Sequence, residues 1–213
     1  ELLHPYSPYA KRALIVLAET YHEEKDFESA RMSASRFLEF YPADEQAAYA
    51  QFIIAISYYD EIEDIGRDQA LMFKALKSLN GLIEKYPQSD FVRSARLKFD
   101  LAFDELAAKE MDVGRYYLKR GHYSAAINRF RVVIEDFQTT SHVPEALHRL
   151  VECYLSLGLN DEAQTAAAVL GHNYQSSNYY NDTYILLGNK GLNPKVKNES
   201  WLVKLYRKVI KGG

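Results

Sequence analysis

The side chains best suited to catalysis or metal binding are scattered along this chain of 213 residues. Its sequence contains no glycine-rich phosphate loop, no His-Glu-x-x-His pair and no nucleophile elbow. Cys153, the single cysteine, precedes an aromatic residue in a helical pattern, and we predict that its thiol is buried and inert. The histidines are dispersed as well: His4, His22, His122, His142, His148 and His172. We therefore predict no catalytic site, no metal site and no cofactor.

Side chains suited to binding are concentrated in residues 47–59, a segment that is apolar on nearly all sides. A surface helix is normally apolar on one side only, unless another side receives a partner. One interpretation is a groove for an aromatic, extended peptide, with Arg12 placed to meet a carboxylate. The other is that neighbouring helices or an upstream repeat cover these side chains. The candidate peptide-binding residues are Arg12, Ile15, Tyr49, Phe52, Ile56 and Tyr59, and Glu19 and His22 project onto the same surface.

A second cluster, between residues 116 and 129, combines aromatic and basic side chains. Arginine is enriched at the energetic centres of protein interfaces, so this cluster is a candidate docking surface. The alternative is that Arg120 and Arg129 are solvated charges, while Tyr117 belongs to the core. The candidate docking residues are Tyr116, Arg120, Asn128 and Arg129.

The elements that position these residues are helices in a repeating array. Gly114, Tyr117, Ala126 and Phe130 have the small–aromatic–small–aromatic spacing of a tetratricopeptide helix hairpin. The small residues let two helices approach closely, and the aromatic residues fill the ends of their crossing. Gly121 suits the left-handed position that ends the first helix.

The hairpin recurs along the chain. Its junction at residues 5–13 matches that at residues 87–95, and related junctions begin at residues 42, 138 and 175, which gives a base unit of 37 residues. The recurring aromatic residues of the first helix are Tyr21, Tyr58, Phe103 and Tyr154, and the recurring small residues of the second are Ala30, Ala75, Ala126 and Ala163. The junction hydroxyls expected to cap helices are Ser7, Ser89, Thr140 and Ser177. We predict an all-α tetratricopeptide-repeat α-solenoid of antiparallel helix pairs.

Insertions enlarge the second and third units. The mostly acidic residues 61–68 form either a solvated loop or a partner-contact loop. Residues 90–120 contain no proline and predict one helix of roughly 30 residues, the alternative being a break near Ala107 or Ala108. A C-terminal amphipathic helix begins at Trp201 and either docks on the last repeat or binds another protein's groove or a membrane surface. We divide the chain into halves at residues 1–89 and 90–213.

Composition narrows the possible partners. The net charge of −3 and the pI near 6.1 argue against a nucleic-acid-binding surface. No apolar run reaches the roughly 18 residues that a membrane-spanning helix requires. A single cysteine excludes an internal disulfide.

In these features the chain resembles the BamD family of outer-membrane assembly lipoproteins. The resemblance is carried by the segment Lys-Glu-Met-Asp-Val-Gly-Arg-Tyr-Tyr-Leu-Lys-Arg-Gly-His-Tyr-Ser-Ala-Ala-Ile-Asn-Arg-Phe (109–130), the two insertions, the Tyr-Pro-x-Ser junctions and the terminal Ser200-Trp201. It implies a five-repeat tetratricopeptide protein of the β-barrel assembly machine. A lipidated N-terminal cysteine would anchor this protein to the periplasmic face of the outer membrane.

The resemblance also implies partners. The C-terminal half would dock on the last POTRA domain of the barrel subunit BamA, and accessory lipoproteins would bind as well. The N-terminal half would recognise the C-terminal signals of unfolded outer-membrane proteins, so that Arg12, Tyr49, Phe52 and Tyr59 face the signal. The residues Arg120, Asn128 and Arg129 would lie in the docking half.

Two departures accompany the resemblance: we expect the family's lipidated cysteine and first repeat to be absent, and His4 stands where an aromatic residue is usual. The expected function is a non-catalytic scaffold whose only link to the membrane is that missing anchor. Two alternatives stay open. One is another periplasmic tetratricopeptide adaptor, and the other is a repeat domain cut from an envelope enzyme such as a peptidoglycan hydrolase.

Overall fold

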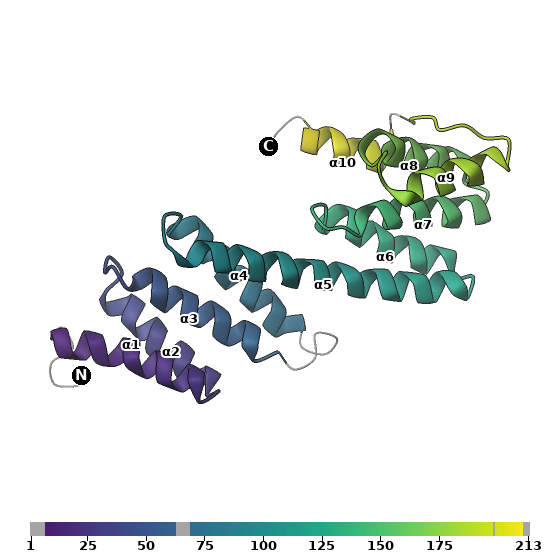
Figure 1. The fold of residues 1–213 in the computed structure, drawn as a ribbon. Helices are drawn as coiled ribbons and strands as arrows, with labels where there is room; N and C mark the ends of the chain where they lie inside the picture. Colours follow the sequence, from purple (N-terminus) through teal and green to yellow (C-terminus); the bar gives the residue numbers. More distant parts are fainter. Residues whose placement is uncertain (1–6, 63–68, 198, 211–213) are drawn as a thin grey trace. The chain divides into compact units, whose positions relative to one another are not determined.

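The computed structural model of the protein describes residues 7–62, 69–197 and 199–210. These residues form ten α-helices and no β-strand, so the predicted all-α fold is confirmed (Figure 1). The helices are α1 (Pro8–Glu23), α2 (Phe27–Phe40), α3 (Ala47–Asp60), α4 (Gln69–Lys85), α5 (Phe91–Lys119), α6 (Tyr123–Asp136), α7 (Val143–Ser156), α8 (Asn160–Asn173), α9 (Asn178–Gly188) and α10 (Trp201–Ile210). Most of the inserted loop at residues 61–68 lies outside the described residues.

The helices pack in two compact units, Glu1–Phe103 and Asp104–Gly213. In the first unit, α1 packs on α2, α2 on α3 and α3 on α4, while α1 also contacts α3. In the second unit, α6, α7 and α8 pack in succession, and α9 contacts both α7 and α8. This stacking of sequence-adjacent helices is that of a tetratricopeptide-type α-solenoid, as predicted.

A repeated turn joins the two helices in the pairs α1–α2, α5–α6 and α7–α8. The backbone N–H of His122 donates to the carbonyl of Tyr117 at 3.0 Å, and Gly121 between them has a φ of 74°, as predicted. Gly158 adopts the same conformation with a φ of 74°. Lys25 holds this position in the first pair with a φ of 63°, a conformation that is sterically unfavourable for a residue with a Cβ atom.

The close helix approach expected at the small residues is present. A Cβ atom at Gly114 would overlap the ring of Phe130, which is fully buried on α6. The pair α5–α6 can therefore pack at this separation only because residue 114 has no side chain. The recurring small residues Ala30, Ala75, Ala126 and Ala163 are all fully buried.

Three of the four predicted hydroxyl caps form. The Ser7 hydroxyl accepts a hydrogen bond from the Ala10 N–H at 3.0 Å, and the Ser89 and Ser177 hydroxyls accept from the N–H two residues later. The prediction for Thr140 is wrong. Its hydroxyl donates backward to the Phe137 carbonyl at 2.8 Å, and the N-cap residue of α7 is His142, whose side chain makes no capping hydrogen bond.

The long helix predicted for the third unit is confirmed as α5, which runs unbroken for 29 residues. The alternative break near Ala107 or Ala108 is wrong. Ala107 is fully buried, and Leu106 and Met111 are buried on the same helix. These apolar positions continue the buried stripe through the inserted turns, so the helix has no reason to end there.

The C-terminal helix docks on the last repeat, one of the three alternatives considered. Leu202 and Val203 are buried, and α10 contacts α8. The Trp201 ring lies 4.4 Å beneath the Arg131 guanidinium and its indole N–H donates to the Tyr154 hydroxyl at 3.4 Å. None of the described helices is long and apolar enough to cross a membrane.

Candidate functional site

The first candidate site is an aromatic surface of the first unit, formed by α3 and the start of α5. Phe91 stacks on both Tyr49 and Phe52, with ring centroids 5.1 Å apart in each pair. Ile56 and Tyr59 follow along α3 at helical spacing, and all five side chains are partly buried. We call this set, Tyr49, Phe52, Ile56, Tyr59 and Phe91, the aromatic face.

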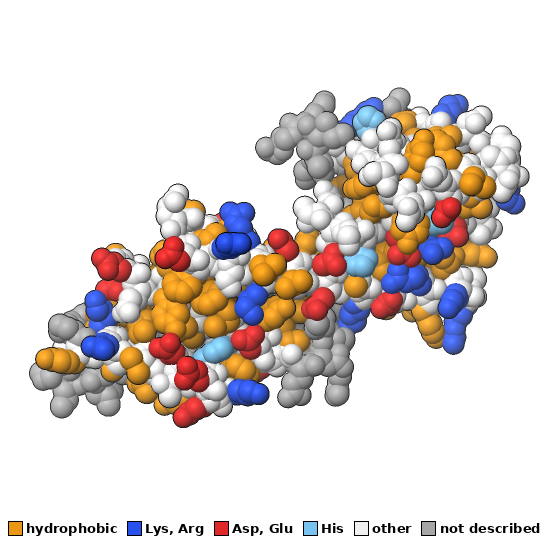
Figure 2. Space-filling model, viewed as in Figure 1, with side chains coloured by type: hydrophobic (Ala, Val, Ile, Leu, Met, Phe, Trp, Pro, Cys, Tyr) orange, Lys and Arg blue, Asp and Glu red, His pale blue; other side chains and the backbone are white. Residues whose placement is uncertain are grey.

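The composition of α3 explains why large rings lie on one side of it. Its opposite side carries small residues, and Ala47, Ala50 and Ala55 are fully buried against neighbouring helices. The larger side chains are therefore left on the outer side. Figure 2 shows hydrophobic side chains gathered over α3 and the first half of α5. Neighbouring helices thus cover part of the apolar segment, as the second interpretation held, and the aromatic face stays partly exposed.

The predicted peptide-binding residues differ in their exposure to solvent. Arg12 is exposed on α1, and the four α3 residues share one side of that helix. Ile15 is only 4% exposed and packs in the core with Leu14 and Ala18. It therefore contributes to the core of the first unit and not to a surface in this structure.

Charged groups border the aromatic face. The Tyr49 hydroxyl donates to Glu19 Oε1 at 2.9 Å. Burial, reinforced by the carboxylates of Glu19 and Glu23, raises the pKa of Tyr49 to about 12, so the phenol stays protonated. At the other end of α3, Asp60 lies 3.1 Å from His22 Nε2 and 3.6 Å from the Lys98 ammonium group.

Sequence reasoning missed two members of this site. The sequence places Phe91 only within the repeat junction at residues 87–95, and no pattern in it distinguishes Lys98. The Lys98 ammonium group lies 4.5 Å from the centroid of the Tyr59 ring, a cation–π distance. The repeat pattern could have identified Phe91, because this residue begins the first helix of the repeat that follows the α3–α4 pair.

The predicted docking residues of the second unit do not form one cluster. The Arg120 guanidinium lies 4.3 Å above the Tyr116 ring, and Tyr116 is 51% exposed. Arg129 instead pairs with Glu110 at 3.0 Å, which ties α6 to α5. Asn128 is exposed on α6 beside Arg129.

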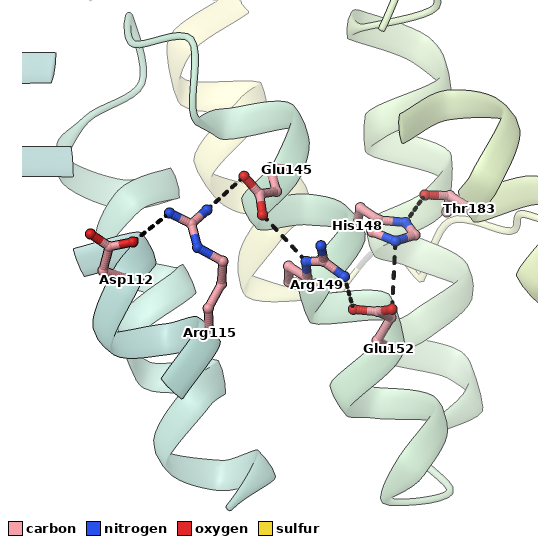
Figure 3. Close-up of polar contacts among 7 residues, drawn as sticks. All are labelled: Asp112, Arg115, Glu145, His148, Arg149, Glu152 and Thr183. Carbon is pink, nitrogen blue, oxygen red and sulfur yellow. Dashed lines mark hydrogen bonds and ion pairs between the residues drawn. The ribbon is translucent and has the colours of Figure 1, made fainter. Parts of the chain in front are cut away.

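A polar network that the sequence did not reveal links α5, α7 and α9 (Figure 3). Arg115 bridges Asp112 on its own helix and Glu145 on α7, at 2.7 and 2.8 Å. Glu145 also accepts a hydrogen bond from Arg149 at 3.4 Å. Long-range pairing of this kind leaves no signal in a single sequence, because the partners lie 30 residues apart. The members are Asp112, Arg115, Glu145, His148, Arg149, Glu152 and Thr183.

Four groups in the network have shifted pKa values, and two of them are Glu145 and His148. Burial alone would raise the pKa of Glu145, but its hydrogen bonds and ion pairs with Arg115 and Arg149 outweigh burial and lower it. Burial lowers the pKa of His148 despite the nearby Glu152 carboxylate. His148 Nδ1 and the Thr183 hydroxyl lie 2.7 Å apart, so this buried contact holds α9 against α7.

Elsewhere in the described residues, no group of three or more histidine, cysteine or acidic side chains is placed to hold a metal ion. The Cys153 thiol is buried, as predicted, and burial raises its pKa to about 12. Such a thiol is a poor nucleophile, because the thiolate is the reactive form.

Comparison with known proteins identifies the family of this chain. The profile of the family YfiO, described as an outer membrane lipoprotein, matches residues 1–170. The chain is 45% identical over 197 residues to the outer membrane protein assembly factor BamD of Caulobacter vibrioides, covering 92% of this chain and 65% of the relative. The chain belongs to the BamD family.

More distant members of the BamD family agree with this assignment. The chain is 41% identical to BamD of Rickettsia prowazekii, covering 87% of this chain and 74% of that protein. It is 27% identical to BamD of Neisseria meningitidis, with 81% and 68% covered. The chain spans about two thirds of the length of the Caulobacter relative. The name that these relatives share describes an assembly factor of the outer membrane.

Proposed function

We propose that this protein is a non-catalytic scaffold of the β-barrel assembly machine, acting at the periplasmic face of the outer membrane. Its relatives are named outer membrane protein assembly factors, and its family is described as an outer membrane lipoprotein. A lipid anchor would hold the full-length protein at the membrane. The scaffold would bring unfolded barrel precursors to the subunit that inserts them.

The single observation that carries this proposal is the stacked set Tyr49, Phe91 and Phe52 on a partly exposed face of the first unit. Stacked rings offer a flat apolar surface that can receive the aromatic side chains of an extended segment. The partner that suits it is the C-terminal signal of an unfolded outer-membrane protein, an extended strand ending in an aromatic residue and a carboxylate. Arg12 would meet that carboxylate.

The second unit would dock on the last POTRA domain of BamA and on accessory lipoproteins. The exposed Tyr116–Arg120 pair offers an aromatic and a guanidinium of the kind that dominates protein interfaces. The network around Glu145 would keep α5, α7 and α9 in fixed positions, so the docking surface is already formed before binding. Residues 1–89, together with Phe91 at the start of α5, would then serve the substrate signal, and the rest of residues 90–213 the partners.

Peptide binding can be tested with a fluorescent ten-residue peptide ending in phenylalanine with a free carboxylate. We expect Phe52→Ala to weaken binding at least about fivefold, because ring contacts of this size contribute about 1–3 kcal/mol. Circular dichroism and urea unfolding establish that the variant is folded. Unchanged peptide affinity in the folded Phe52→Ala protein would contradict the proposed groove.

The matched control for the first unit is Tyr116→Ala in the second. We expect this variant to bind the peptide like the unaltered protein and to lose affinity for the isolated POTRA domains of BamA. Phe52→Ala should show the reverse pattern. If both substitutions affected both ligands equally, the assignment of one function to each half would be wrong.

A further inference from the structure

Exposed charges of both signs lie on the side of α1 that adjoins the aromatic face. Arg12, Glu19 and Glu23 lie on α1 at intervals of seven and four residues, which places them on one side of that helix. All three are exposed. Glu19 is the one that accepts the hydrogen bond from Tyr49, so this side of α1 adjoins the aromatic face. In Figure 2, acidic and histidine side chains lie along the edge of the hydrophobic patch.

The two α1 carboxylates act together on the face. Both Glu19 and Glu23 contribute to raising the pKa of Tyr49, so both are close enough for their charge to be felt at its hydroxyl. Asp60 lies at the other end of α3, where the Lys98 ammonium group offsets its charge at 3.6 Å. The two glutamates therefore carry the negative potential of what we call the acidic edge, Glu19 and Glu23.

Helix geometry gives the separation of Arg12 from the acidic edge along α1. The rise of about 1.5 Å per residue puts Glu19 about 10 Å, and Glu23 about 16 Å, along α1 from Arg12. An extended peptide advances about 3.3 Å per residue. The distance from Arg12 to the acidic edge therefore corresponds to about three to five residues of bound peptide.

We propose that the aromatic face binds an extended peptide in one direction, with its terminal carboxylate at Arg12 and a lysine or arginine three to five residues earlier at the acidic edge. The inference rests on the proposed peptide-binding function and adds a direction and a charge requirement to it. A peptide bound the other way round would bring its carboxylate to two glutamates and its basic group to Arg12. Like-charge contacts at both ends disfavour that orientation.

The test compares ten-residue peptides that all end in phenylalanine. One carries lysine four residues before the end, one carries glutamate there, one carries the lysine at its first residue, and one ends in an amide. We expect the first peptide to bind about threefold to fivefold more tightly than the second at low salt, as one or two exposed ion pairs allow. The lysine at the first residue should give no such gain.

Variants then locate the two ends. In Glu19→Gln with Glu23→Gln, the preference for the near lysine should fall to less than about twofold, while the amide introduced at position 19 can still accept the Tyr49 hydrogen bond. Glu24→Gln, an exposed neighbour that points away by about 100° around the helix, is the matched control and should keep the preference. Arg12→Gln should abolish the difference between acid and amide peptides and leave the lysine preference intact.

Each outcome bears on one claim. If the lysine preference survives in the Glu19→Gln and Glu23→Gln protein, or is equal for both lysine positions, the directional inference is wrong. If Phe52→Ala weakens binding while no charge pattern is seen, the inference fails and the peptide-binding function stands. If none of the peptides binds the unaltered protein, the proposed function itself fails.

Discussion

Adding one methyl group at Gly114 tests whether the close approach of α5 and α6 determines the stability of the second unit. In Gly114→Ala, the new Cβ atom would lie 2.8 Å from Cζ and 2.9 Å from Cδ1 of Phe130, and nearer still to Cε1. Carbon atoms in favourable contact are about 3.5–4.0 Å apart. Phe130 is fully buried, so α5 and α6 must separate or the ring must leave its rotamer.

Two opposing effects determine how much Gly114→Ala changes the free energy of unfolding. Alanine is more favourable than glycine inside a helix by about 0.8–1.0 kcal/mol. Overpacking of a core side chain costs about 1–3 kcal/mol. Because three ring atoms are too close to the new Cβ atom, the upper part of that range applies. We expect Gly114→Ala to lower the free energy of unfolding by about 1–2 kcal/mol net.

Gly81→Ala is the matched control. Gly81 lies inside α4, and a Cβ atom there would have nothing within 4 Å. The same substitution should therefore raise the free energy of unfolding by about 0.5–1 kcal/mol, since only the helix-propensity gain remains. The two alanine substitutions thus have opposite expected signs.

Urea unfolding followed by tryptophan fluorescence measures the effect at Gly114. Trp201 is the only tryptophan and contacts Tyr154 and Arg131 within the second unit, so its emission reports on that unit. With an m-value of about 1–3 kcal/mol/M, the midpoint should fall by roughly 0.3–2 M. Circular dichroism follows Gly81→Ala in the first unit. A rise in the midpoint for Gly114→Ala would refute the close-approach reasoning.

A double-mutant cycle then identifies the atoms responsible. Phe130→Leu removes the ring that the new methyl group would meet, at the cost of a cavity. We expect the two substitutions together to destabilise by less than the sum of the single effects, with a coupling of about 0.5–3 kcal/mol. Strict additivity would place the strain somewhere other than the Gly114–Phe130 contact.

Three further predictions follow from the same structure. Lys25→Gly should raise the free energy of unfolding by about 1 kcal/mol, because the φ of 63° at Lys25 is unfavourable for a residue with a side chain. Gly121→Ala, at the same turn position, should lower the free energy of unfolding. The urea midpoint of each variant tests its prediction. Glu145→Gln should cost about 1–3 kcal/mol near pH 7. Because the folded pKa of Glu145 is lowered, its contribution is present above the ordinary value of 4.5 and lost as pH falls through the folded pKa, so the variant should show a flatter acid limb than the exposed control Glu105→Gln. Native Cys153 should react with a thiol reagent only as urea unfolds the second unit, and fast labelling without urea would contradict its burial.

Much of the fold could be predicted because its determinants are local and periodic. The left-handed turns at Gly121 and Gly158 and the close packing at Gly114 follow from the types of residue at repeat positions. The failure at Thr140 has an equally local cause. Its hydroxyl found an acceptor in the Phe137 carbonyl of the preceding turn, and a threonine can satisfy either bond.

The candidate sites were less predictable, because they depend on which side of a helix faces its neighbour. Ile15 and Arg12 are three residues apart on α1, yet one is in the core and the other is exposed. A projection with an error of a few tens of degrees exchanges such positions. The partners of Glu145 were invisible for another reason, since ion pairs between separate helices have no fixed spacing in the sequence.

Phe91 joins the aromatic face because of its position in the repeat and because of the helix that packs beside it. Tyr9 and Phe91 occupy equivalent positions in their repeats, each at the start of the first helix of a helix pair. Phe91 is partly buried because α3 packs ahead of its helix and supplies Tyr49 and Phe52. Tyr9 is 87% exposed, and the described residues contain no helix ahead of α1. The exposure of the ring at this repeat position therefore depends on whether another helix packs against the start of its own helix.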